Sequence, residues 1–177
     1  MRRLMLLRHA KTESDAPSGR DQDRRLDERG HRDAAEIGGW IGRNPPFPDC
    51  VLVSPAVRAH QTWDIAWEAM KGLAPRPHVE LVPDLYGAEP MQLLQAIRMA
   101  SVCNPKRLML IGHNPGMHEL ALALLGSGEA AGRKALADNL PTSGLAVLDF
   151  AIDDWDDVAL RRGRLVLFVS PKLLKQT

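Results

Sequence analysis

Short aliphatic runs recur along the chain and predict buried β-strands. Each run is nearly continuous rather than alternating, which is typical of strands covered on both faces of a parallel sheet. Three of these runs are Leu4–Leu7, Val51–Val53 and Leu108–Ile111. Two later runs, Leu145–Phe150 and Leu165–Val169, are predicted to extend the same sheet.

Segments with the apolar spacing of amphipathic helices lie between the runs. The first helix is predicted over Glu28–Arg43, with Asp27 placed to cap its start. A second is predicted to begin at Ser54-Pro55, a capping residue followed by proline. The third is expected to cover about Pro90 to Ser101.

A fourth helix is predicted to begin at Asn114-Pro115 and to stop at Gly126. The polar stretch Thr12–Arg25 and the stretch Gly126–Thr142 are expected to be loops. Strands that alternate with helices favour a three-layer α/β/α sandwich with a mainly parallel central sheet. Neither an internal repeat nor a long linker divides the chain, so residues 1–177 are expected to form a single domain.

Composition excludes several function classes. The 23 Lys and Arg residues almost balance the 22 Asp and Glu residues, so nothing favours a nucleic acid or an anionic membrane as partner. No segment approaches the roughly 18 apolar residues of a membrane span, and the first run stops at Arg8, too early for a signal peptide. Cys50 and Cys103 form no metal-ligand or redox spacing. A cytoplasmic protein with reduced thiols is therefore expected.

The strand ends carry the candidate chemistry. Ligands of parallel sheets bind at the edge where the carboxyl ends of the strands meet. Arg8 and His9 follow the first strand, Arg58 lies shortly after the second, and His113 follows the third, with Asn114 beside it.

This set of residue types is suited to phosphoryl chemistry. Arginine offers a planar fork of donors that matches phosphate oxygens, and helix N-termini add free N–H groups. A neutral histidine, its other ring nitrogen bound to an acceptor such as a backbone carbonyl, is able to attack phosphorus. Neighbouring arginines would disfavour the protonated form. Spacing alone leaves an ordinary structural role open for each residue.

Six ordered segments resemble the histidine phosphatase superfamily, the fold group of phosphoglycerate mutases and acid phosphatases. They are LLRHAKT (Leu6–Thr12), DRRLDERG (Asp23–Gly30), VSPAVRAHQT (Val53–Thr62), LYGAEPMQLL (Leu85–Leu94), LIGHNPGMHEL (Leu110–Leu120) and LPTSGLAVL (Leu140–Leu148). Ala10 stands where the superfamily usually has glycine, as in the small bacterial branch of SixA-type phosphohistidine phosphatases. The resemblance implies a phosphoglycerate mutase-like fold.

Roles follow from the resemblance residue by residue. It implies that His9 is the phosphorylated nucleophile and that Arg8, Arg58 and His113 complete the phosphate pocket, with His113 binding the transferring oxygens if protonated. Arg24 matches a basic residue near the phosphate, although Arg25 stands where the branch usually has proline. Asn114 is a further candidate for substrate binding.

A general acid has no clear equivalent in the chain. Glu89 is the nearest candidate, with an ordinary first-turn helix acid as its alternative role, and Glu13 and Asp15 are weaker ones. General acid catalysis is worth about 10²–10⁴-fold, so a poor leaving group needs it more than the imidazole of phosphohistidine does. The short connection between Arg58 and His113 leaves little room for a cap over the site. Both observations favour an activated phosphoryl donor on a protein.

The leading hypothesis is a metal-independent, cofactor-free phosphatase for phosphohistidine on a phosphorelay or phosphotransfer protein. The alternative is a phosphatase for small phosphorylated metabolites, such as sugar phosphates or nucleotides. A mutase would need a closed pocket and an acid, and a non-catalytic phosphoprotein-binding module would not need a neutral nucleophile. The sequence leaves open whether the Thr12–Arg25 loop closes over the site.

Overall fold

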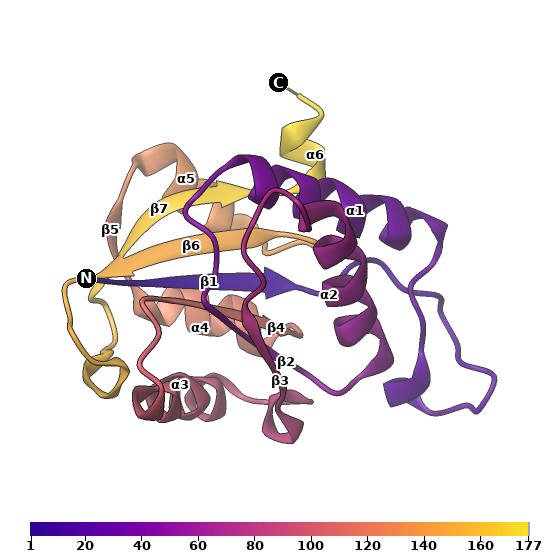
Figure 1. Cartoon of the computed structure of the whole chain (residues 1–177), viewed down its shortest axis with the longest axis horizontal. Helices are drawn as coiled ribbons and strands as arrows, with labels where there is room; N and C mark the ends of the chain where they lie inside the picture. Colours follow the sequence, from indigo (N-terminus) through magenta and orange to yellow (C-terminus); the bar gives the residue numbers. More distant parts are fainter. Residues whose placement is uncertain (177) are drawn as a thin grey trace.

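The computed structural model describes residues 1–176, whose strands form one seven-stranded sheet in the order β3-β2-β4-β1-β6-β7-β5 (Figure 1). The strands are β1 (Arg2–Arg8), β2 (Cys50–Val53), β3 (His78–Leu81), β4 (Arg107–Gly112), β5 (Leu125–Gly128), β6 (Leu145–Phe150) and β7 (Gly163–Val169). The helices are α1 (Glu28–Arg43), α2 (Val57–Met70), α3 (Pro90–Met99), α4 (Gly116–Leu124), α5 (Ala130–Asp138) and α6 (Pro171–Leu174).

The predicted mainly parallel sheet is confirmed. β3, β2, β4 and β1 pair in parallel, and so do β7 and β5. β6 runs antiparallel to both of its neighbours, β1 and β7. The carboxyl ends of β1, β2 and β4 therefore lie at one edge of the sheet.

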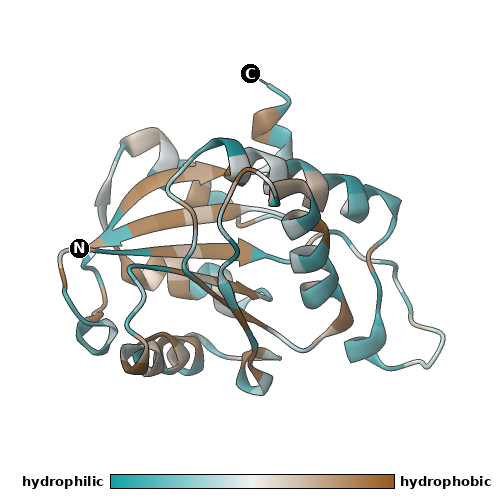
Figure 2. Cartoon of the chain, viewed as in Figure 1, coloured by the Kyte–Doolittle hydropathy of each residue, from teal (hydrophilic) through white to brown (hydrophobic). Residues whose placement is uncertain are grey.

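Helices cover both faces of the sheet, which confirms the three-layer sandwich (Figure 1). Along β1, Leu4 and Leu6 belong to the core with α3, α4 and α5, whereas Met5 and Leu7 belong to the core with α1 and α2. Side chains of a strand point alternately to opposite faces, so a strand covered on both sides must be apolar throughout. In Figure 2 the central strands are mostly coloured as hydrophobic, whereas the helices around them mix hydrophobic and hydrophilic residues.

The prediction for α1 is confirmed at both ends. Asp27 caps the helix, and its carboxylate accepts a hydrogen bond from Gly30 N at 2.7 Å. Farther along, α1 crosses α2 closely, because Gly38 lies against the backbone of Ala66.

The predicted start of the second helix is wrong. α2 begins at Val57, with Ala56 as its N-cap and no side-chain cap hydrogen bond. The Ser54 hydroxyl lies instead 2.7 Å from His113 Nε2, with Ala56 N a longer 3.3 Å away. A serine that follows a strand can cap the next helix or bind a side chain that is distant in sequence, and Ser54 binds His113.

The fourth helix and the second predicted loop also differ from expectation. α4 begins at Gly116, and Asn114 and Pro115 lie before the helix, with Pro115 as its N-cap. The helix ends at Leu124, and Gly126 belongs to β5. The stretch Gly126–Thr142 therefore holds part of β5 and all of α5 rather than a loop. Similarly, α3 ends at Met99, and a 3₁₀ turn continues over Ala100–Val102.

None of the helices in residues 1–176 is long and apolar enough to cross a membrane. Both cysteines are free thiols: Cys50 is buried and Cys103 is exposed.

The close crossing of α1 and α2 makes a testable prediction. In Gly38→Ala the new Cβ would overlap the Ala66 backbone, and we expect a loss of about 1–3 kcal/mol in the free energy of unfolding. The matched control is Gly39→Ala, whose Cβ would meet only the flexible Arg43 side chain at 3.1 Å. We expect that control to be neutral or up to about 1 kcal/mol more stable. Urea unfolding measures both, and equal effects of the two substitutions would contradict the crossing geometry.

Candidate functional site

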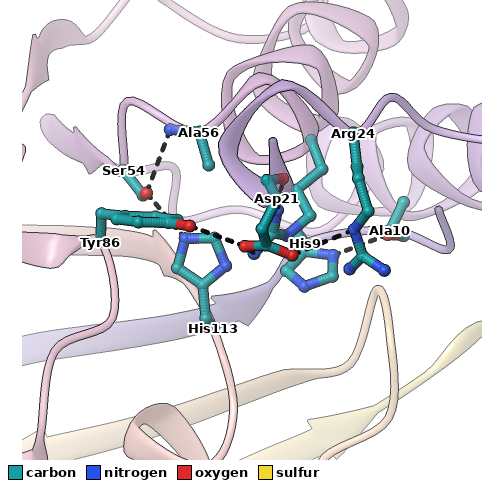
Figure 3. Close-up of polar contacts among 9 residues, drawn as sticks. His9, Ala10, Asp21, Arg24, Ser54, Ala56, Tyr86 and His113 are labelled. Carbon is teal, nitrogen blue, oxygen red and sulfur yellow. Dashed lines mark hydrogen bonds and ion pairs between the residues drawn. The ribbon is translucent and has the colours of Figure 1, made fainter. Parts of the chain in front are cut away.

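The candidate residues lie together at the carboxyl ends of three adjacent strands, β2, β4 and β1. Arg8 ends β1 and His9 follows it, while His113 follows β4 directly. The pairing continues past the strand ends, since His9 N donates to Gly112 O at 3.1 Å and Ser54 N donates to Ile111 O at 3.0 Å. As a result the rings of His9 and His113 lie with their centroids 5.2 Å apart (Figure 3).

The backbone fixes the tautomer of His9. Its Nδ1 lies 2.7 Å from the carbonyl oxygen of Ala10, and a carbonyl only accepts, so Nδ1 carries the proton. The lone pair is then on Nε2. Ala10 is held in turn, because its N–H donates to Thr62 Oγ1 at 2.9 Å and that hydroxyl donates to the carbonyl of Arg58 at 2.7 Å.

Burial is the main reason that His9 is neutral. It lowers the pKa of His9 to about 3, with smaller contributions from His113, Arg58 and Arg8, against the opposing effect of the Ala10 hydrogen bond. The neighbouring arginines thus act in the direction expected from the sequence but are not the largest cause. His9 presents a neutral, potentially nucleophilic Nε2 at any pH near neutrality.

His113 faces the site with its other nitrogen. Its Nε2 lies 2.7 Å from Ser54 Oγ, and its Nδ1 is buried without a hydrogen-bond partner. Burial, followed by Arg58, lowers the pKa of His113 to about 4, so the ring is neutral in the free protein. The hypothesis of a protonated His113 therefore requires a bound anion that raises its pKa.

Two of the three arginines share Asp21 as a partner, and the third, Arg8, binds a backbone carbonyl. Arg8 Nη1 donates to the carbonyl of Leu140 at 3.2 Å, and burial lowers the pKa of this guanidinium. Arg58 is buried and donates from Nη1 to Asp21 O at 2.8 Å and from Nη2 to Asp21 Oδ2 at 3.0 Å. Arg24 Nε forms an ion pair with Asp21 Oδ1 at 3.2 Å.

Buried polar atoms without a hydrogen-bond partner gather in this site. Among the described residues, all but Asp33 Oδ1 belong to it: Arg8 Nε, Arg24 Nε, Arg58 Nε, His113 Nδ1 and Ser143 Oγ. An unmade buried hydrogen bond costs about 1–3 kcal/mol, and native proteins keep few of them. Because the arginine nitrogens are cationic donors, their concentration beside His9 indicates an anion-binding site.

Sequence reasoning missed four residues of the site. Asp21 and Ser54 bind Arg58 and His113 respectively, and the Tyr86 ring packs edge-on against His113 with centroids 5.6 Å apart. Ser143 N donates to the carbonyls of Arg8 and His9, both at 3.1 Å, and its φ of 58° is left-handed. Ser54, Tyr86 and Ser143 lie in quoted motifs, whereas Asp21 lies in the predicted Thr12–Arg25 loop, and the partners of all four are distant in sequence.

Two predicted candidates have other contacts in this structure. Asn114 Nδ2 donates to Leu140 O at 2.8 Å, and its Oδ1 accepts from His118 N at 3.2 Å, so both ends of the amide are engaged. Glu89 is exposed and caps α3, where its N–H donates to Gln92 Oε1 at 2.8 Å. Within residues 1–176, no hydrogen bond or ion pair joins Glu89 to His9 or His113.

Size alone does not locate the site. An apolar groove of about 730 Å³ lies between α3 and the β2–β3 edge of the sheet, lined by residues such as Leu52, Val82 and Met99. None of the candidate site residues lines this groove. In the part of the chain that the structure describes, no group of three or more His, Cys, Asp or Glu side chains could hold a metal ion.

Comparisons with known proteins agree with this geometry. The profile of the histidine phosphatase superfamily (branch 1) matches residues 4–85. An uncharacterised protein of Mycobacterium tuberculosis is 38% identical over 170 residues, which cover 94% of this chain and 100% of the relative. A SixA-type structure from Agrobacterium tumefaciens is 35% identical with a TM-score of 0.78, covering 96% of this chain and 98% of the other.

The same fold also occurs in a mycobacterial glucosyl-3-phosphoglycerate phosphatase. That structure is 17% identical with a TM-score of 0.64, and the match covers 94% of this chain and 97% of the other. At this identity the likeness concerns the fold alone.

The lowered pKa values of the two histidines predict a titration. We expect ring-¹⁵N NMR to show His9 as the neutral Nδ1–H tautomer and His113 as neutral down to about pH 5, because their pKa values are about 3 and about 4. Unfolded histidine binds a proton below about pH 6.5, so the unfolded state takes up more protons in this window. The free energy of unfolding should therefore fall as the pH drops from about 6.5 towards 4. Midpoints near 6.5 for both rings would contradict the burial of the site.

Proposed function

The chain belongs to the histidine phosphatase superfamily, and we propose that it hydrolyses phosphohistidine on a phosphorelay or phosphotransfer protein through a covalent phosphohistidine at His9. Within the superfamily it is a SixA-type protein. The proposal rests on one observation above all. Three nitrogens that are buried without a hydrogen-bond partner, Arg8 Nε, Arg58 Nε and His113 Nδ1, lie around His9, whose Nε2 carries the lone pair.

The first step transfers the phosphoryl group to the protein. The Nε2 lone pair of His9 attacks phosphorus, and a new N–P bond forms as the N–P bond of the substrate breaks. The electron pair of the broken bond stays on the substrate imidazole, which takes a proton from solvent. His9 keeps its Nδ1 proton, because Nδ1 donates to the Ala10 carbonyl oxygen at 2.7 Å. This hydrogen bond also stabilises the positive charge that develops on the ring.

The second step returns His9 to its starting state. Water attacks the phosphorus of the His9 adduct, inorganic phosphate leaves, and the electron pair of the N–P bond returns to Nε2. In both steps charge gathers on the phosphoryl oxygens. Arg8, Arg58 and the Nδ1–H of His113 would bind these oxygens, with Arg24 at the rim, and this preorganised charge is the largest contribution the site can make. No step uses a metal ion or an organic cofactor.

Proton supply favours a phosphohistidine substrate. The carboxyl group that contacts the site belongs to Asp21, and the Tyr86 hydrogen bond and Arg58 hold its pKa below the usual range. Asp21 is thus ionised at neutral pH and is a poor acid, while Glu89 caps a helix. A leaving imidazole accepts a proton from solvent far more readily than an alkoxide does, so the site suits cleavage of an N–P bond.

Accessibility favours a protein substrate. The chain between Arg58 and His113 is taken up by α2, β3, α3 and β4 with short turns, so no inserted cap covers the site. The similar Agrobacterium tumefaciens protein is described as a SixA phosphohistidine phosphatase, which supports a phosphohistidine protein as substrate here. We place the activity in the cytoplasm and assign it to residues 1–177 as one domain. Small phosphorylated metabolites are the alternative substrates, because related folds include a sugar phosphatase.

Trapping the intermediate tests the mechanism. After an acid-free quench with a phosphohistidine-carrying protein, we expect an acid-labile, base-stable label on His9, formed equally well with a chelator present. His9→Ala should lose the label and about 10³-fold or more in turnover, since it removes the nucleophile. His31→Ala, at a histidine on the exposed face of α1, is the matched control and should keep both. Full turnover by a folded His9→Ala variant would refute the mechanism.

Glu89→Gln separates the two substrate classes. With a phosphohistidine protein we expect turnover within a factor of about two of wild type, because Glu89 caps α3 and forms no hydrogen bond or ion pair with His9 or His113 among the described residues. A panel of sugar phosphates and nucleotides should be turned over poorly by both forms. Efficient turnover of a small monoester that falls by about 10²-fold or more in Glu89→Gln would instead identify Glu89 as an acid and favour the alternative.

A further inference from the structure

One carboxylate lies inside the cationic site. Asp21 belongs to a 3₁₀ turn, Asp21–Asp23, in the loop after β1. Its Oδ2 accepts hydrogen bonds from Tyr86 OH at 2.7 Å and from Arg58 Nη2 at 3.0 Å, and its Oδ1 pairs with Arg24 Nε at 3.2 Å. Figure 3 shows Asp21 between Tyr86 and Arg24, beside the rings of His9 and His113.

Asp21 occupies donors that a phosphate would otherwise use. Together its backbone and side-chain oxygens bind both terminal nitrogens of Arg58, while Arg58 Nε stays buried without a partner. A guanidinium has five N–H groups, so an anion can still bind Arg58 through the remaining ones. That anion would share the guanidinium with the Asp21 carboxylate.

The charges of the site determine how strongly Asp21 opposes a bound phosphate. Arg8, Arg24 and Arg58 supply three positive charges and Asp21 one negative charge, which the Tyr86 hydrogen bond and Arg58 keep ionised by lowering its pKa. A phosphate dianion entering the site gains attraction from the arginines and meets repulsion from Asp21. The carboxylate is 53% exposed, so water weakens this repulsion without removing it.

We propose that Asp21 is a built-in competing anion that keeps the affinity of the site for free phosphate low and so lets the product leave. This role rests on the proposed phosphatase function and adds an affinity-determining residue to it. During transfer a covalent N–P bond keeps the phosphoryl group in the site, whereas only ionic attraction and hydrogen bonds retain the released dianion. Lowering the affinity for phosphate thus favours turnover.

Titration calorimetry of the full chain with inorganic phosphate, at fixed ionic strength, tests the role. Asp21→Asn keeps an acceptor of the same shape but removes the charge, and we expect it to bind phosphate about tenfold more tightly than wild type. Asp21→Glu keeps the charge and should bind nearly as weakly as wild type. Asp23→Asn removes one charge from the same turn and should leave the affinity unchanged, because the Asp23 carboxylate accepts from Ser18 Oγ at 2.8 Å and, among the described residues, from none of the site arginines.

Product inhibition gives a second readout. The inhibition constant for phosphate should fall in Asp21→Asn by the same factor as the dissociation constant. A purely structural role of Asp21 in holding the loop would weaken phosphate binding or leave it unchanged in Asp21→Asn, and either result would overturn the proposal. An equal gain in phosphate affinity in Asp23→Asn would overturn the proposal as well, because the loss of any negative charge from this turn would then have the same effect.

The outcomes also separate this role from the proposed function. If His9 becomes labelled but Asp21→Asn and wild type bind phosphate equally, the role of Asp21 is wrong and the phosphatase mechanism stands. If Asp21→Asn gains affinity but His9 never becomes labelled, Asp21 controls an anion site and the covalent mechanism is wrong.

Discussion

The parallel register of β1, β4 and β2 is the constraint on which the site depends. Ile111 of β4 lies opposite Leu7 of β1 on one side and opposite Val53 of β2 on the other. The three strands therefore end at the same level, and the residues that follow them meet. A slip of one residue in either pairing would turn His9 or His113 to the other face of the sheet. The apolar alternation that fills both cores fixes this register, so the packing of the interior and the geometry of the site have one cause.

The site itself works against stability. His9, Arg58 and His113 are at most 9% exposed, and two of their nitrogens, Arg58 Nε and His113 Nδ1, have no hydrogen-bond partner. Burial keeps both histidines neutral and strips water from the arginines, which makes their fields stronger. The aliphatic cores on both faces of the sheet offset the cost. What remains is a set of fixed donors that need not reorganise when charge develops on a phosphoryl group.

Local pattern predicted much of this fold, and the rest depends on contacts that are distant in sequence. The aliphatic runs identified five strands, and Asp27 marked the start of α1 correctly. β3 and β5 were not predicted, because they are short, largely exposed strands at the two edges of the sheet. β3 contains a histidine and a glutamate, and β5 contains two glycines. Residues at the strand ends could be predicted as a group, because parallel topology brings such ends together. The partnerships of Ser54 with His113 and of Asp21 with Arg58 could not, since they span 59 and 37 residues.

The hydrogen bond from His9 to the Ala10 carbonyl determines which ring nitrogen attacks phosphorus, and this can be measured directly. It assigns the proton to Nδ1, and therefore the attack on phosphorus to Nε2. ¹⁵N–³¹P correlated NMR of the trapped phosphoenzyme distinguishes the two ring nitrogens. We expect a single adduct in which phosphorus is coupled to Nε2 of His9. Phosphorus on Nδ1 of His9, or on another residue, would contradict this mechanism.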